Sequence, residues 1–184
     1  MAYTLIKVSK LDAARRQLQT AIELWFHAGD QVSIHSLACA AYEIIHDLNR
    51  RAKGPPLYFD TDWIKDEFRK EYINLVKRPG NFFKHADFRK DKAESLDLNP
   101  ALAEGFILFA VRGLHFLGKV LTDTEAAYLV WTVIHKPHLL KPEGRELFFK
   151  DIPIEGLNNL RRVKKGKFFN AYLCRRKWAY SGLH

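Results

Sequence analysis

Residues 99–120 read NPALAEGFILFAVRGLHFLGKV, and this stretch decides the fold class of the chain. Asn99 is a favoured N-cap residue, and Pro100 follows at the first helical position, where its missing backbone N–H is tolerated. Apolar residues then fall on nearly every side of the expected helix, which is typical of a helix that is packed on several sides. We therefore expect a helix that extends to Val120 and lies at the centre of an all-α bundle.

Two further helices are expected before this central one. Ser9 and Asp12 form a plausible capping box, and apolar residues recur at helical spacing over residues 10–27. Asp30 is the expected N-cap of a second helix, whose apolar positions continue to Leu48. The short connection between them predicts two antiparallel neighbours.

Prolines set the next boundaries. Residues 53–59, KGPPLYF, are expected to form a loop, because paired prolines remove backbone donors and favour extended geometry. A third helix is predicted to begin at Thr61 or Asp62 and to end at residues 79–80, Pro-Gly. Asn81 is then the expected N-cap of a new helix.

The run YLVWTVI at residues 128–134 has the composition of a strand, but a helix is the better prediction. Thr122 and Glu125 form a capping box just before it. Residues 144–151 are expected to be a short helical or irregular piece. A helix led by Pro153 and a last helix after Gly166 complete the chain.

Size and composition predict a single domain. The chain has 184 residues, of which 47% are hydrophobic and 13% aromatic, which suits one ordinary core. We predict an all-α, single-domain bundle of five to seven helices. Residues 1–152 are expected to form its core, and residues 153–184 a basic C-terminal helical arm of the same domain.

Two cysteines, Cys39 and Cys174, are too few for a disulfide scaffold, and no CxxC pair suggests a zinc ribbon. No secretory signal and no apolar run long enough for a membrane span are evident. We expect a cytoplasmic protein without a cofactor.

Positive charge is concentrated at the C-terminal end. The formal net charge is +9, and residues 155–184 hold eight basic residues against one acid, Glu155. Cations interleaved with aromatic residues suit phosphate contacts together with base stacking. An anionic membrane surface, or plain docking and oligomer contact, are alternatives. The predicted nucleic-acid-binding residues are Arg161, Arg162, Lys164, Lys165, Lys167, Arg175, Arg176 and Lys177.

Residues 77–87, KRPGNFFKHAD, hold the main catalytic candidates, Arg78 and His85. An imidazole can exchange a proton near neutral pH, and a guanidinium is a permanent phosphate ligand. The R-x6-H spacing resembles the motif of the HEPN group of small helical-bundle proteins. That resemblance implies a metal-independent endoribonuclease, in which His85 would handle the proton of the 2′-hydroxyl or leaving group and Arg78 would stabilise phosphate charge.

The same stretch also resembles a group of uncharacterised bacterial helical proteins with an N-x-x-K-H-A-D core. This resemblance implies that Asn81, Lys84, His85 and Asp87 act as a unit, in support of the catalytic pair. The alternative is a structural joint, in which Asn81 caps a helix, Lys84 faces water and His85 bonds Asp87 or a backbone carbonyl.

Polar residues on the second helix suggest a metal alternative. His35, Cys39, Glu43 and His46 fall within one arc opposite the apolar stripe. Glu43-x-x-His46 has the spacing of di-metal bundles, and His46 followed by aspartate looks like the HD pair of metal-dependent phosphohydrolases. A second polar helix face, solvated or at a dimer interface, is the other interpretation of the same residues.

The leading hypothesis is therefore an RNA-directed helical protein with HEPN-like endoribonuclease chemistry. The first alternative is a non-catalytic protein-interaction module, and the second is a metal-dependent hydrolase. We also expect a homodimer, because the second helix and the aromatic last helix offer more faces than one core can use.

Overall fold

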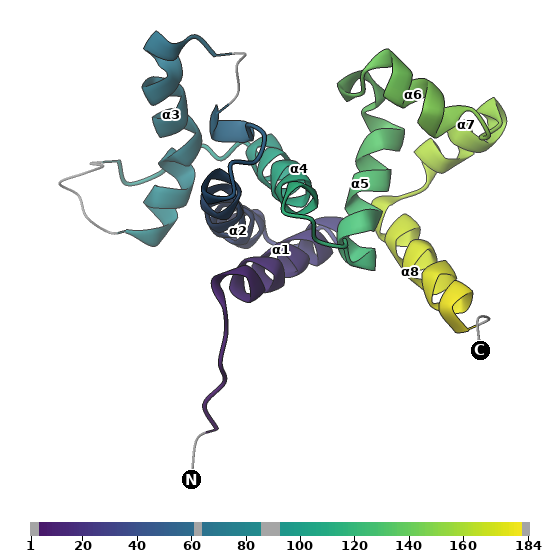
Figure 1. Ribbon diagram of the computed structural model, residues 1–184, viewed down its shortest axis with the longest axis horizontal. Helices are drawn as coiled ribbons and strands as arrows, with labels where there is room; N and C mark the ends of the chain where they lie inside the picture. Colours follow the sequence, from purple (N-terminus) through teal and green to yellow (C-terminus); the bar gives the residue numbers. More distant parts are fainter. Residues whose placement is uncertain (1–3, 61–63, 86–92, 182–184) are drawn as a thin grey trace. The chain divides into compact units, whose positions relative to one another are not determined.

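The computed structural model describes residues 4–60, 64–85 and 93–181 (Figure 1). These residues form eight α-helices and two 3-10 helices, without a β-strand, so the all-α prediction is confirmed and the expected number of helices was too low. The elements are α1 (Lys10–Phe26), α2 (Gln31–Arg51), η1 (Tyr58–Asp60), α3 (Asp66–Lys84), α4 (Ala101–Phe116), α5 (Asp123–His135), η2 (Pro137–Leu139), α6 (Pro142–Phe149), α7 (Ile154–Arg162) and α8 (Lys165–Ser181).

The chain divides into two compact units. Unit 1 consists of Met1–Trp25 and Gly29–Val120, and unit 2 of Phe26–Ala28 and Leu121–His184. The predicted core, residues 1–152, thus extends over both units. None of the described helices combines the length and the apolar run that crossing a membrane requires.

The core of unit 1 is formed where α4 lies along α2 (Figure 1). Tyr42 and Ile45 of α2 and Phe106 of α4 are fully buried there. A methyl group added at Gly113 of α4 would lie 2.5 Å from Ile45 Cγ2, so only glycine allows this approach. The central position expected for α4 is therefore correct within unit 1.

Helix α4 ends at Phe116, four residues before the predicted end. Gly118 adopts a left-handed conformation with φ of +67°, and its N–H donates to the carbonyl of His115. The N–H of Lys119 donates to the carbonyl of Leu114. A left-handed glycine of this kind commonly ends a helix, and the apolar residues beyond Phe116 concealed that signal.

The predicted helix caps at Asp30 and Thr122 are confirmed. The Asp30 carboxylate accepts from the Ser33 backbone N–H at 2.7 Å, and this bond lowers the pKa of Asp30. Thr122 and Glu125 form the reciprocal capping box, so residues 128–134 are helical. Each cap depends on residues three positions apart, which is why the sequence reveals them.

The predicted boundaries of α3 are wrong. The helix begins at Asp66 and continues through Pro79 to Lys84, so Asn81 lies in its last turn and caps no new helix. A proline inside a helix removes one backbone hydrogen bond. Pro79 and Gly80 are both buried, however, and a methyl group at Gly80 would lie 3.0 Å from Cys39 Sγ of α2. Close packing against α2 offsets the lost bond.

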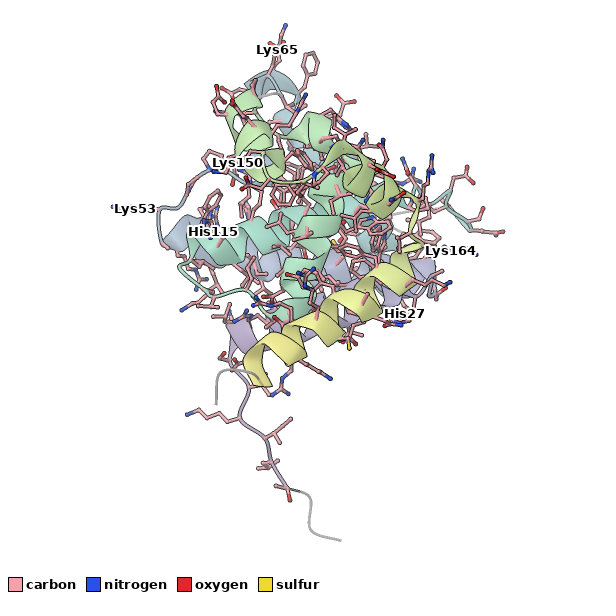
Figure 2. The ribbon with its side chains drawn as sticks, turned by 90° about the vertical axis from the view of Figure 1, so that its right-hand side faces the viewer. His27, Lys53, Lys65, His115, Lys150 and Lys164 are labelled. Atoms are coloured by element: carbon pink, nitrogen blue, oxygen red, sulfur yellow. The ribbon has the colours of Figure 1, made fainter. Side chains whose placement is uncertain are left out.

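Unit 2 is built around Phe26, the last residue of α1. Its ring stacks on Phe169 of α8 with centroids 4.5 Å apart and meets Tyr128 and Trp131 of α5 edge-on. His27 lies beside α8 (Figure 2), with its ring 5.7 Å from that of Phe169. Residues 144–151, expected to be short helical or irregular, lie largely within α6, which begins at Pro142 and ends at Phe149.

Candidate functional site

Arg78 and His85 are both exposed and lie near the end of α3. His85 is the C-cap, and its backbone N–H donates to the Asn81 carbonyl at 3.1 Å. Seven residues of helix make two turns, or about 10 Å, and return to nearly the same side. Because α3 continues to Lys84, Arg78 and the C-cap His85 lie toward one side of the helix, at a separation that a phosphate could bridge.

The supporting residues differ in their surroundings. Asn81 is exposed, whereas the Lys84 ammonium pairs with Glu43 of α2 at 3.7 Å. Lys77 pairs with the other carboxylate oxygen of Glu43 at 3.3 Å. Lys84 thus links α3 to α2 through an ion pair, whereas the structural-joint alternative expected it to face water only. Asp87 lies outside the described residues.

The polar arc of α2 is covered, so the prediction of a solvated or dimer-forming face is wrong for its first half. His35 and Cys39 are fully buried. The His35 ring lies edge-on to Phe83 of α3 and Phe106 of α4, at 6.0 and 5.5 Å. Neither of its ring nitrogens has a hydrogen-bond partner. Burial lowers the pKa of His35 from 6.5 to about 4, with a further contribution from Lys84.

Burial acts on the neighbouring thiol in the opposite direction. It raises the pKa of Cys39 from 9.0 to about 11, and the Glu43 carboxylate adds to the shift. Cys39 is therefore a thiol at neutral pH and fills space next to Gly80. It lacks the thiolate character that nucleophilic or metal-binding cysteines need.

His46 makes a contact that the sequence did not predict. Its Nε2 lies 2.6 Å from Asp60 Oδ2 of η1, and its Nδ1 lies 3.7 Å from Asp47 Oδ1. Asp60 comes after a proline-containing loop whose sequence has no helical or strand periodicity. Its pairing with His46 could therefore not be predicted from local sequence. The loop is positioned by long-range bonds, including that from the Phe59 N–H to the Tyr42 hydroxyl at 3.0 Å.

The three metal candidates do not converge. His35 is enclosed by aromatic rings, Glu43 pairs with two lysines, and both nitrogens of His46 face carboxylates. Within residues 4–60, 64–85 and 93–181, no group of three or more His, Cys, Asp or Glu side chains is arranged to hold a metal ion.

The basic residues of the C-terminal arm separate into two groups. Arg161 donates to the Ile134 carbonyl at 3.0 Å, and Arg176 pairs with Asp123 at 2.9 Å, so these two arginines bind the two ends of α5. Lys165 is half-buried. The remaining cations are exposed, and we call them the basic face: Arg162, Lys164, Lys167, Arg175 and Lys177.

The aromatic residues of α8 take a different role from the one expected for base stacking. Phe168 and Phe169 are buried against Phe26, and Tyr172 stacks on Phe168 with centroids 6.0 Å apart. These three rings belong to the core of unit 2. Lys164 immediately precedes α8 (Figure 2), and Lys167, Arg175 and Lys177 are exposed along that helix.

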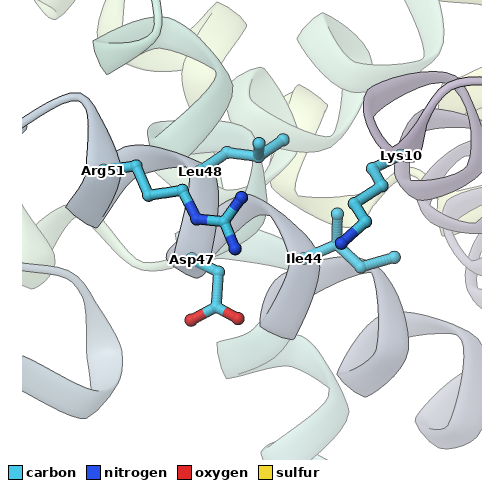
Figure 3. A pocket seen from close by; sticks show the side chains of 5 residues that line it. All are labelled: Lys10, Ile44, Asp47, Leu48 and Arg51. Atoms are coloured by element: carbon cyan, nitrogen blue, oxygen red, sulfur yellow. The ribbon is translucent and has the colours of Figure 1, made fainter.

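A shallow hollow of about 150 Å³ lies between the start of α1 and the end of α2 (Figure 3). Lys10, Asp47 and Arg51 surround a floor of Ile44 and Leu48. Neither the Arg78–His85 pair nor any residue of the basic face lines it. Its charges are mixed, and Asp47 also pairs with Arg50 at 3.6 Å.

The fold and these sites define an all-helical protein with a basic C-terminal face and an exposed arginine–histidine pair. No protein-family model, curated protein or solved structure matches the chain.

Proposed function

We propose that the protein binds RNA, or another nucleic acid, by contacting its phosphates with the basic face of α7 and α8. The observation that carries this proposal is the exposure of five cations there, on a segment in which no acidic residue follows Glu155. Arg176 is neutralised by Asp123, and the Arg161 guanidinium is held by the Ile134 carbonyl, so both are engaged within unit 2. The five residues of the basic face supply the attraction instead.

The arrangement of α8 suits backbone contact more than base readout. Phe168 and Phe169 of α8 are buried, whereas its Lys167, Arg175 and Lys177 are exposed. A helix fixed by its aromatic side presents these cations without further folding. Lysine and arginine attract phosphates irrespective of base identity, so we propose binding that depends little on sequence.

A neutralisation experiment tests this proposal. The triple variant Lys164→Gln, Lys167→Gln and Lys177→Gln should weaken RNA binding roughly tenfold or more near physiological salt, measured by fluorescence anisotropy. The matched control is Lys53→Gln, Lys70→Gln and Lys119→Gln, which removes the same charge from exposed positions of unit 1. Equal loss in both variants, or no binding by the wild type, would contradict the proposal.

Cleavage by Arg78 and His85 is a second proposal, favoured by their exposure on one side of an uninterrupted α3. His85 would transfer a proton, and Arg78 would stabilise the phosphate as charge develops. His85→Ala should reduce RNA cleavage by about two orders of magnitude without changing the melting temperature. His115→Ala, at another exposed histidine, is the control. Cleavage that survives in His85→Ala would refute the assignment.

A non-catalytic interaction protein is the rival from another class. In that case the wild type would bind a protein partner, and neither RNA binding nor cleavage would be detected in the two experiments above.

A further inference from the structure

An apolar stripe on α3 lies beside its buried side. Phe68 is 53% exposed and Leu75 is 68% exposed, and Phe82 is half-buried. The three residues are spaced by seven, so they follow one line along the helix. The contacts with α2 use other positions: Gly80 lies beside Cys39, the Phe83 ring meets that of His35, and Lys77 and Lys84 pair with Glu43. We call Phe68, Leu75 and Phe82 the α3 stripe.

Two charges of opposite sign lie along the same edge of the α3 stripe. Glu71 and Arg78 are also seven residues apart, and both are exposed. Leu75 lies midway between Phe68 and Phe82 and close to the midpoint of Glu71 and Arg78. The two phenylalanines therefore lie at equal distances on either side of Leu75. The two charged residues also lie on either side of it and have opposite charges.

This symmetry makes the surface complementary to itself. If a second copy of α3 lies antiparallel with Leu75 on Leu75, Phe68 of each copy faces Phe82 of the other. Glu71 of each copy then comes opposite Arg78 of the other, which gives two equivalent ion pairs. In a parallel two-fold arrangement the Glu71–Arg78 edges of the two copies would lie on opposite sides of the seam and make no ion pairs with each other, so the charges favour the antiparallel pairing.

We propose that two copies of this chain associate through the α3 stripe, antiparallel and with two-fold symmetry about Leu75. Such an interface is isologous, which is the commonest form of soluble homodimer. Arginine has five donors, so Arg78 can pair with Glu71 of the second copy in addition to its other interactions. The inference involves none of the cations of the basic face, so it is independent of RNA binding there, although it shares Arg78 with the cleavage proposal.

Analytical ultracentrifugation of the full chain over a range of concentrations tests the interface. The wild type should dimerise, and Leu75→Glu should be monomeric, because it places two carboxylates at the centre of the seam. Leu147→Glu is the matched control, since Leu147 is 71% exposed on α6 and lies outside the stripe. It should dimerise like the wild type, and circular dichroism should show that both variants are folded.

A charge exchange tests the antiparallel register. Glu71→Arg and Arg78→Glu should each raise the dimer dissociation constant roughly tenfold, because each creates like-charge pairs. The double variant, in which both changes are made, should restore most of the affinity. A wild type that stays monomeric at every concentration, a dimer that Leu75→Glu leaves intact, or a double variant no better than the single ones would overturn the proposal.

Discussion

Replacing Gly113 with valine is expected to destabilise the protein by about 3 kcal/mol or more. The first added carbon would lie 2.5 Å from Ile45 Cγ2 and 3.1 Å from Leu57 Cδ1, and both of these residues are fully buried. Neither neighbour can move into solvent, so α4 would have to shift away from α2. Chemical denaturation should show a lower midpoint for Gly113→Val than for the wild type.

The control for this substitution is Gly156→Ala in α7, where a methyl group would meet no atom within 4 Å. Alanine has a higher helix propensity than glycine by up to about 1 kcal/mol, so this variant should match or slightly exceed the stability of the wild type. A Gly113→Val variant as stable as Gly156→Ala would show that α2 and α4 are not in close contact.

Replacing His35 with leucine is expected to remove a large part of the acid sensitivity of the fold. Burial lowers the pKa of His35 from 6.5 in the unfolded chain to about 4, so the unfolded chain binds the additional proton first as the pH falls. The free energy of unfolding therefore keeps its full value above pH 6.5. It decreases as the pH falls from 6.5 toward 4, because protons bind the unfolded chain more readily than the folded one. The loss at pH 4 should be on the order of 3 kcal/mol.

Urea denaturation at pH 7 and at pH 4 measures this effect. His35→Leu should equal or exceed the wild type at pH 7, because it removes two buried nitrogens that lack hydrogen-bond partners. It should also lose less stability at pH 4. His115→Gln, at an exposed histidine, should retain the pH dependence of the wild type. Identical pH profiles for His35→Leu and the wild type would contradict the buried, neutral imidazole.

Local patterns predicted the fold class and most helix starts. Asp30 and Thr122 bind backbone N–H groups three residues along the chain, so their caps can be identified without knowledge of the tertiary structure. Pro79 shows the opposite case. Its local preference predicts a break, but α3 continues, with Pro79 and Gly80 buried and Gly80 packed beside Cys39 of α2, some 40 residues away in the chain.

For the candidate site too, local features could be predicted from the sequence and long-range contacts could not. Periodicity placed His35 and His46 on one arc of α2, but it could not show that α3 and α4 enclose His35 or that η1 brings Asp60 to His46. The charge of the C-terminal arm was evident in the sequence. The roles of Arg161 and Arg176 were not, because their partners Ile134 and Asp123 lie 27 and 53 residues away.

The salt dependence of RNA binding tests the role of the basic face most directly. Log Kd should rise linearly with log salt for the wild type, because binding releases counterions from the phosphates. The triple glutamine variant at Lys164, Lys167 and Lys177 should reduce that slope by about two units, whereas the control variant at Lys53, Lys70 and Lys119 should preserve it. A wild-type slope near zero, or equal slopes for both variants, would contradict phosphate binding by α7 and α8.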